Sequence, residues 1–205
     1  MFEIVRAGGW LMLPIILCAI VAMGILLERI WTLKTSRVIP DDLTARVWGW
    51  VKKNELNTKQ IQSLHNGSPM GQILAAGLMH RNFDRALMKE SIEDTGRHVV
   101  HELERYLETL GTVAAISPLL GLLGTVIGMV QVFTEITTQG VGDPTALAGG
   151  ISVALITTAA GLTVAIPALV GYRYLRNRID TLVIRMEKEA LKLIEAIHRR
   201  NAGQS

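Results

Sequence analysis

The sequence predicts an all-α integral membrane protein with three transmembrane helices and long helical extensions in the cytoplasm. The chain has 205 residues with 21 Lys and Arg and 18 Asp and Glu, yet three windows hold no charge at all: 7–27, 109–134 and 144–172. Each window exceeds the roughly 18 apolar residues that indicate a membrane-spanning helix. No alternating pattern of useful length indicates a strand, so the remaining chain is also expected to be helical.

The first apolar window is predicted to be a permanent anchor. Residues 9–27 match the hydrocarbon core in length, and Trp10 and Trp31 are placed as interfacial anchors. The window ends at Glu28-Arg29 without a small-residue cleavage site, which argues against a removable signal peptide. The second and third spans are predicted at 109–133 and 146–172.

The distribution of Lys and Arg predicts the topology. Arg6 precedes the first span, the 134–145 connection holds none, and all other Lys and Arg lie in 28–108 and 173–205. By the positive-inside rule, residues 1–8 and 134–145 face the periplasmic side and the two basic regions face the cytoplasm. Arg173, Arg176 and Arg178 follow the third span directly, where they are expected to anchor the chain at lipid headgroups.

Helix signals organise the 28–108 region and the C-terminal tail. Pro40-Asp41 opens one helix, and Asn66-Gly67-Ser68-Pro69 is a turn followed by a cap for a second helix over 69–80. From Asp84 we expect a helix that runs straight into the second span. The 173–205 tail repeats apolar residues at helical spacing directly after the third span, so it needs a partner surface for that stripe.

Nothing in the chain predicts an enzyme, a cofactor or a metal centre. No HExxH, Walker or GxSxG pattern occurs, and Cys18 is the single cysteine. His98 and His101 have a spacing that can bind a metal, but a solvated helix face explains them better. The chain holds 4 Trp, 3 Tyr and 3 Phe, and its basic residues form no aromatic-interleaved stripe, so we expect no nucleic-acid partner.

Small residues recur at helical spacing in the second and third spans, which predicts close helix packing. They are Gly121, Gly124 and Gly128 in the second span, and Gly150, Ala154 and Gly161 in the third. Pro118 and Pro167 are predicted to kink these two helices. Thr125, Thr157 and Thr158 are the polar side chains deepest in the spans. Membrane threonines usually bond to their own helix, so their position alone favours packing over a pathway.

The runs Ser117–Gly128, Leu147–Leu162 and Ala165–Ala168 resemble the MotA/TolQ/ExbB proton channel family and look most like its ExbB branch. The resemblance extends to the order of spans and cytoplasmic regions. It implies a homopentamer in the bacterial inner membrane, with spans two and three around a central pore that receives a single-span partner resembling ExbD. It further implies that the assembly uses the proton motive force to energise transport through a TonB-like protein. Thr125 and Thr158 match the family's pore-facing threonines.

One position departs from the family pattern. ExbB and TolQ proteins commonly carry a glutamate five residues before the threonine that Thr158 matches, and here that residue is Val153. No span contains a carboxylate, histidine or lysine, and a threonine hydroxyl does not titrate in a useful range. If protons move through this assembly, the resemblance therefore implies that the partner supplies an intramembrane Asp.

Two alternatives stay open at this point. The chain resembles TolQ nearly as well, which implies an envelope-constriction motor of the Tol-Pal type. A non-conducting oligomeric membrane scaffold would use the same glycine faces without a pathway. A flagellar stator subunit fits less well, because that branch has four spans and only three are visible here.

Overall fold

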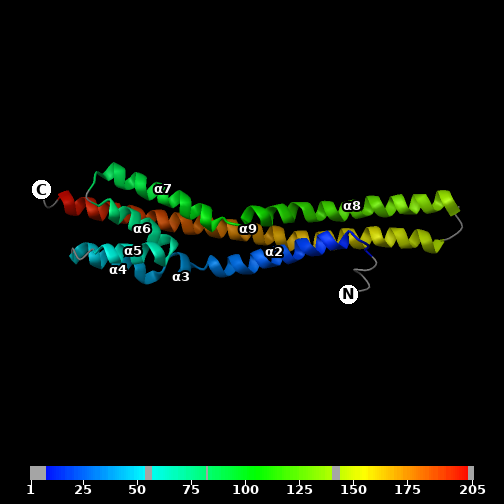
Figure 1. Ribbon diagram of the computed structural model, residues 1–205, viewed down its shortest axis with the longest axis horizontal. Helices are drawn as coiled ribbons and strands as arrows, with labels where there is room; N and C mark the ends of the chain where they lie inside the picture. The colour runs from blue at the N-terminus through cyan, green and yellow to red at the C-terminus, as the bar shows by residue number, and fades with distance from the viewer. Residues whose placement is uncertain (1–7, 54–56, 82, 140–143, 203–205) are drawn as a thin grey trace. The chain divides into compact units, whose positions relative to one another are not determined.

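The computed structural model describes residues 8–53, 57–81, 83–139 and 144–202, and no strand occurs among them. The helices are α2 (Met12–Thr32), α3 (Thr35–Val38), α4 (Asp41–Lys53), α5 (Thr58–Gly67), α6 (Pro69–Met79), α7 (Arg85–Leu103), α8 (Leu107–Gln139) and α9 (Pro144–Ala202) (Figure 1). The predicted all-α class is confirmed for this part of the chain.

The chain divides into two compact units. The apolar unit comprises Met1–Glu28 and Tyr106–Tyr174, and the polar unit comprises Arg29–Arg105 and Leu175–Ser205. Helix α9 contributes its first part to the apolar unit and its second part to the polar unit.

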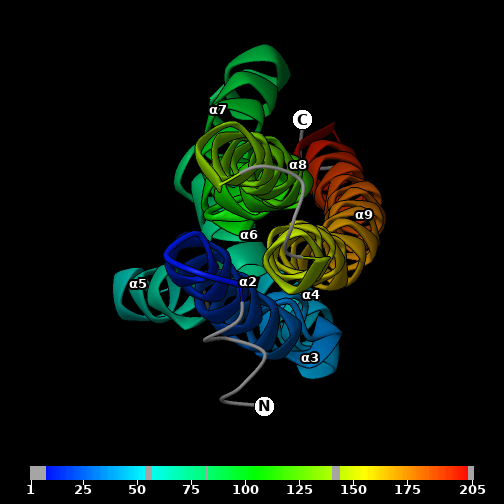
Figure 2. The same cartoon turned by 90° about the vertical axis from the view of Figure 1, so that its right-hand side faces the viewer.

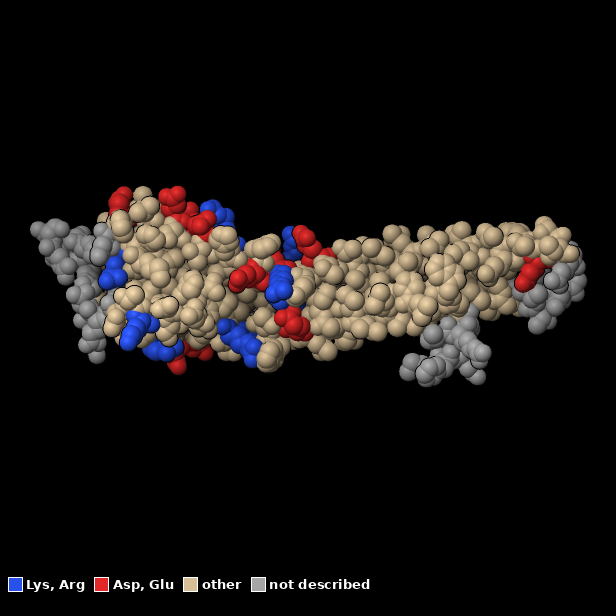
Figure 3. All heavy atoms as spheres, in the orientation of Figure 1, with Lys and Arg blue, Asp and Glu red and all other residues tan. Residues whose placement is uncertain are grey.

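The apolar unit holds the helices of the three predicted spans. Segments of α2, α8 and α9 are long and apolar enough to cross a membrane. Large apolar side chains such as Leu119, Phe133 and Leu155 are about 60% exposed, as expected where lipid rather than water surrounds a helix. Figure 3 shows that the visible surface over most of α8 and the first part of α9 carries no Lys, Arg, Asp or Glu.

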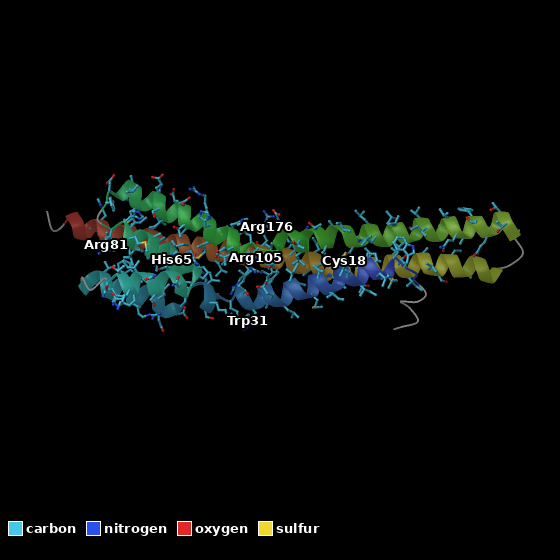
Figure 4. The ribbon with its side chains drawn as sticks, in the orientation of Figure 1. Cys18, Trp31, His65, Arg81, Arg105 and Arg176 are labelled. Atoms are coloured by element: carbon cyan, nitrogen blue, oxygen red, sulfur yellow. The ribbon has the colours of Figure 1, made fainter. Side chains whose placement is uncertain are left out.

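Helix α2 packs against α9 in this unit. The side chain of Leu26 fills the space where a Cβ on Gly171 would lie, and Ile156 approaches Gly8. Figure 2 shows α2 end-on beside the first part of α9. Cys18 lies midway along α2 and is half-buried (Figure 4).

The polar unit contains α3 to α7 and the second part of α9, and α6 packs against both α5 and α7. Its core is apolar and includes Leu74, Leu78, Met186 and Leu193, each at most 2% exposed. The predicted cap of α6 is confirmed: the Ser68 side chain accepts a hydrogen bond from the Gly71 amide at 3.1 Å, and Pro69 is the first helical residue.

The prediction of one continuous helix from Asp84 into the second span is wrong. Helix α7 ends at Leu103 and α8 begins at Leu107, with Tyr106 between them in the left-handed region at φ 64°. Nothing in the local sequence signals this break, because the 104–106 segment contains neither glycine nor proline. By contrast, the third span continues directly into the C-terminal tail, since α9 is one helix from Pro144 to Ala202.

A buried arginine explains how α7 can end where it does. Arg29, at the end of α2, is 4% exposed, and its Nη1 donates to the carbonyl oxygens of Glu102 and Leu103, at 3.4 Å each. The last carbonyls of a helix have no partner within the helix, and the helix dipole places negative charge there. Arg29 supplies both hydrogen bonds and a positive charge, so it acts as the C-terminal cap of α7.

We predict that Arg29→Met lowers the stability of the protein by about 1–3 kcal/mol, because one buried and one part-buried carbonyl lose a charged donor. Arg37→Met is the matched control: the Arg37 guanidinium lies 3.5 Å from the centroid of the exposed Trp31 ring, an interaction worth about 0.5–1 kcal/mol. Thermal unfolding of the detergent-solubilised variants measures both. Equal shifts in the two midpoints would contradict the capping role.

Candidate functional site

The candidate site lies along the contact between α8 and α9 in the apolar unit, which we call the seam. Figure 1 shows the two helices side by side over this region. A Cβ on Gly121 would lie 3.0 Å from the Thr157 carbonyl oxygen, and a Cβ on Gly161 would lie 2.5 Å from the Ser117 carbonyl oxygen. Neither position has room for a larger residue, because backbone rather than a movable side chain occupies the space.

The same close approach continues toward the far ends of the two helices. A Cβ on Gly128 would lie 2.9 Å from the Gly150 carbonyl oxygen and 3.0 Å from the Ala154 Cβ. The six small residues that the sequence placed on packing faces are thus brought together in one seam. Pro118 and Pro167 lie within α8 and α9, which continue through them, so the kinks stay a prediction.

Thr157 fills the centre of the seam. It is fully buried, and its side chain occupies the space that a Cβ on Gly124 would need. Its hydroxyl donates to the carbonyls of its own helix, at 3.0 Å to Val153 and 2.9 Å to Ala154. Thr157 is therefore a packing residue with a satisfied hydroxyl, a role that the sequence could not separate from that of Thr158.

Thr158 makes the polar contact that crosses the seam. Its hydroxyl donates to the Gly121 carbonyl oxygen at 3.0 Å, and the side chain is half-buried. This contact exists because Gly121 has no side chain to hold α9 away. In an α-helix the carbonyl of residue 121 also accepts from the amide of residue 125, so Thr158 bonds to the turn of α8 that leads to Thr125.

Thr125 lies one turn further along α8 than Gly121 and is also half-buried. Its hydroxyl donates to the Leu122 carbonyl of its own helix at 2.6 Å. Thr125 thus lies one helical turn along α8 from the carbonyl that Thr158 contacts, and the pathway role of both threonines stays a prediction. Each hydroxyl has its proton engaged and retains acceptor capacity on its oxygen.

The seam carries no titratable group. Val153 is half-buried on α9, and the flanking positions of α8 and α9 over 109–134 and 148–172 are uncharged. Among the described residues no group of three His, Cys, Asp or Glu is placed to hold a metal ion. The chemistry available here is hydrogen bonding by hydroxyls and backbone carbonyls.

Of the three arginines expected at lipid headgroups, Arg178 is engaged within the polar unit. Its Nη2 donates to the Thr35 hydroxyl at 2.7 Å and its Nε approaches the Leu33 carbonyl at 3.5 Å. Arg173 and Arg176 are exposed, and Figure 4 shows Arg176 on α9. Arg178 contacts the turn between α2 and α3, and headgroup binding stays a prediction for all three arginines.

Gly124→Ala is predicted to destabilise the protein by about 1–3 kcal/mol, because the new methyl group overlaps the Thr157 side chain. Gly149→Ala is the control, since a Cβ there meets nothing within 4 Å. Thermal unfolding in detergent compares them. Adding Thr157→Ala to Gly124→Ala should recover most of the loss, and a double variant no more stable than Gly124→Ala would show that this contact does not set the packing.

Three apolar helices, a glycine-lined seam and a neutral pair of threonine hydroxyls define a helical membrane protein whose polar contacts lie between two spans. Comparison with known proteins is consistent with this class. Residues 65–188 match the model of the MotA/TolQ/ExbB proton channel family. The chain therefore belongs to the MotA/TolQ/ExbB proton channel family, as its motifs indicated.

Individual relatives come from both branches. The biopolymer transport protein exbB1 of Vibrio cholerae is 30% identical over 87% of this chain and 80% of its own length. The biopolymer transport protein ExbB-like 1 of Synechocystis is 35% identical over 82% of this chain and 67% of its own length. The Tol-Pal system protein TolQ of Pseudomonas aeruginosa is 26% identical over 92% of this chain and 87% of its own length.

Proposed function

We propose that this chain is the channel-forming subunit of an inner-membrane motor that uses the proton motive force to energise TonB-dependent outer-membrane transport. In this proposal five copies surround a pore, and an ExbD-like single-span partner contributes an intramembrane Asp. The N-terminus is periplasmic and the C-terminus cytoplasmic. The observation that carries the proposal is the hydrogen bond from Thr158 to Gly121 beside Thr125, in a family of proton channels.

The neutral seam supports the proposal that the partner carries the proton, because the described residues of the seam include no titratable group. A carboxylate near mid-membrane costs about 3 kcal/mol, so the partner's Asp is stable there only beside groups that solvate it. With its proton on the Gly121 carbonyl, the Thr158 hydroxyl offers an acceptor, which suits a protonated Asp. To solvate an ionised Asp, the hydroxyl has to turn away from Gly121 and donate.

The change of the Thr158 hydroxyl from acceptor to donor links the protonation state of the partner's Asp to its hydrogen bonds inside the proposed pore. A proton crossing about 100 mV delivers roughly 2.3 kcal/mol, which is comparable to the cost of holding the carboxylate. Each protonation change of the Asp would therefore change which threonine it prefers, and a loosely packed central helix pair would move accordingly.

Thr158→Val is predicted to keep assembly and to reduce energised uptake by about tenfold or more, where a tenfold effect corresponds to about 1.4 kcal/mol. Valine keeps the shape and removes the donor, and a single such hydrogen bond in a membrane contributes only about 0.6 kcal/mol to stability. Thr158→Ser should retain uptake. Thr163→Val is the control, because that exposed hydroxyl donates only to Ala159 of its own helix.

Uptake of a TonB-dependent substrate in cells that rely on this subunit is the measurement, with the membrane level of each variant determined alongside. Normal uptake with Thr158→Val would remove Thr158 from the pathway. A passive scaffold would keep both assembly and function in all three variants.

The native mass of the detergent-extracted protein, expressed with its single-span partner, tests the architecture. Five copies that hold one or two partner chains are expected. A monomer, a dimer or a species without partner would leave the helical fold intact and rule out the proposed pore.

A further inference from the structure

A groove lies between α7 and the second part of α9 in the polar unit. Its volume is about 610 Å³, which is within the range of protein binding pockets. Helices α6, α7 and α9 meet beside it, because a Cβ on Gly77 would contact the side chains of Ile92 and Leu193. The apolar side chains that line the groove are Ile73, Ile92, Val100, Val183, Met186 and Ala190.

Gly96 leaves open space on the α7 side of this groove. It lies inside a helix of 19 residues, where glycine is less favourable than alanine. A Cβ at this position would meet nothing within 4 Å, so packing within the chain does not require a glycine here. Any larger residue would place its side chain in the groove.

Acidic side chains outnumber basic ones along the groove. On the neighbouring exposed face of α9, Asp180 and Glu195 flank the exposed Ile184 and Leu191, and Lys188 is the base on that face among the described residues. The titratable residues that line the groove itself are Glu93, Arg97, His101, Glu104 and Glu187.

Two of the lining carboxylates have no ion pair. Glu93 pairs with Lys89 at 3.3 Å, and Arg97 pairs with Asp94 at 3.2 Å, so Arg97 does not neutralise the other acids of the groove. Among the described residues no ion pair involves Glu104 or Glu187. Exposed carboxylates beside an apolar surface favour a segment that carries both basic and apolar side chains.

We propose that this groove binds the cytoplasmic flank of the single-span partner. The inference rests on the proposed function and adds a contact outside the membrane. The positive-inside rule predicts that the cytoplasmic flank of a single span is rich in Lys and Arg, which is the charge that the groove favours. The bases of the flank meet Glu104 and Glu187, and its apolar side chains cover the apolar lining.

The height of the groove above the membrane suits such a segment. Its α9 residues begin at Val183, and Arg176 is the residue of this unit that we expect at the lipid headgroups. The helix rises about 10 Å between these two residues. An extended chain covers about 3.3 Å per residue, so about three residues cover this height and the following ones can lie in the groove.

Binding of a peptide tests the contact. The probe is a fluorescent synthetic peptide with the sequence of the partner's cytoplasmic flank, titrated into the detergent-solubilised full chain purified without the partner. Fluorescence anisotropy measures its Kd. Glu104→Gln combined with Glu187→Gln is expected to raise the Kd about tenfold or more, because the bases of the peptide lose two charged acceptors. Gly96→Leu is expected to raise it as well, because the new side chain fills the groove.

Matched controls separate the groove from general effects of charge and of glycine replacement. Asp42→Asn combined with Glu102→Gln removes the same charge from two exposed residues that do not line the groove. Gly49→Leu replaces a glycine inside α4 that also has nothing within 4 Å of its Cβ position. Both controls should leave the Kd unchanged.

The native mass of the chain co-expressed with the partner is measured in parallel, so that the two proposals can fail separately. Weaker binding in the groove variants alone supports the groove. Equal weakening in the control variants, or no binding by the unchanged chain, overturns it, and the proposed function stands if the ring still holds the partner. Groove-specific binding without such a ring overturns the proposed function and leaves the groove as the site for a basic segment.

Discussion

The close approach of α8 and α9 is the constraint on which the candidate site depends. Backbone meets backbone at Gly121 and Gly161, so the distance between the two helices is set by the absence of side chains. Only at that distance can the Thr158 hydroxyl reach the Gly121 carbonyl at 3.0 Å. Inside a bilayer no water competes for that carbonyl, so packing of apolar spans decides where a polar contact forms.

Most described hydroxyls in these helices are satisfied locally, which makes the exception informative. Ser117, Thr157 and Thr163 donate to carbonyls three or four residues earlier in their own helices. Such bonds satisfy the hydroxyl within its own helix and do not link one helix to another. Among the described hydroxyls of α8 and α9, Thr158 donates across the seam, so a change in its hydrogen bonding affects two helices.

The sequence predicted the parts of this arrangement that repeat with the helical period. Charge-free windows indicated the spans, and small residues at spacings of three and four indicated the seam. Thr157 and Thr158 differ by about 100° around one helix, so their roles depend on which face meets α8, and local spacing cannot decide that. The structure separates a buried packing residue from the residue that crosses the seam.

Contacts between residues far apart in the sequence determine where α7 ends, which the sequence did not predict. From the sequence, Arg29 counts among the basic residues that predict a cytoplasmic location, because it follows an apolar span. In the structure it caps a helix that ends more than 70 residues later. When the contact with Arg29 is not known, the sequence of the segment before α8 predicts a continuous helix. The break at 104–106 is therefore a tertiary property, and no local residue preference encodes it.

A seam without charged groups avoids the free-energy cost of placing a carboxylate in the membrane. A carboxylate fixed in each subunit would require solvation in every copy of a ring, at about 3 kcal/mol each, whether or not a proton was in transit. Hydroxyls and carbonyls that satisfy one another carry no such cost at rest. In the proposed ring, such a seam would meet the partner's charge at one subunit at a time, through a threonine hydroxyl that turns from the Gly121 carbonyl to donate to it. Val153, where the resemblance implies a glutamate, fits the proposed ring, in which the partner supplies the group that titrates.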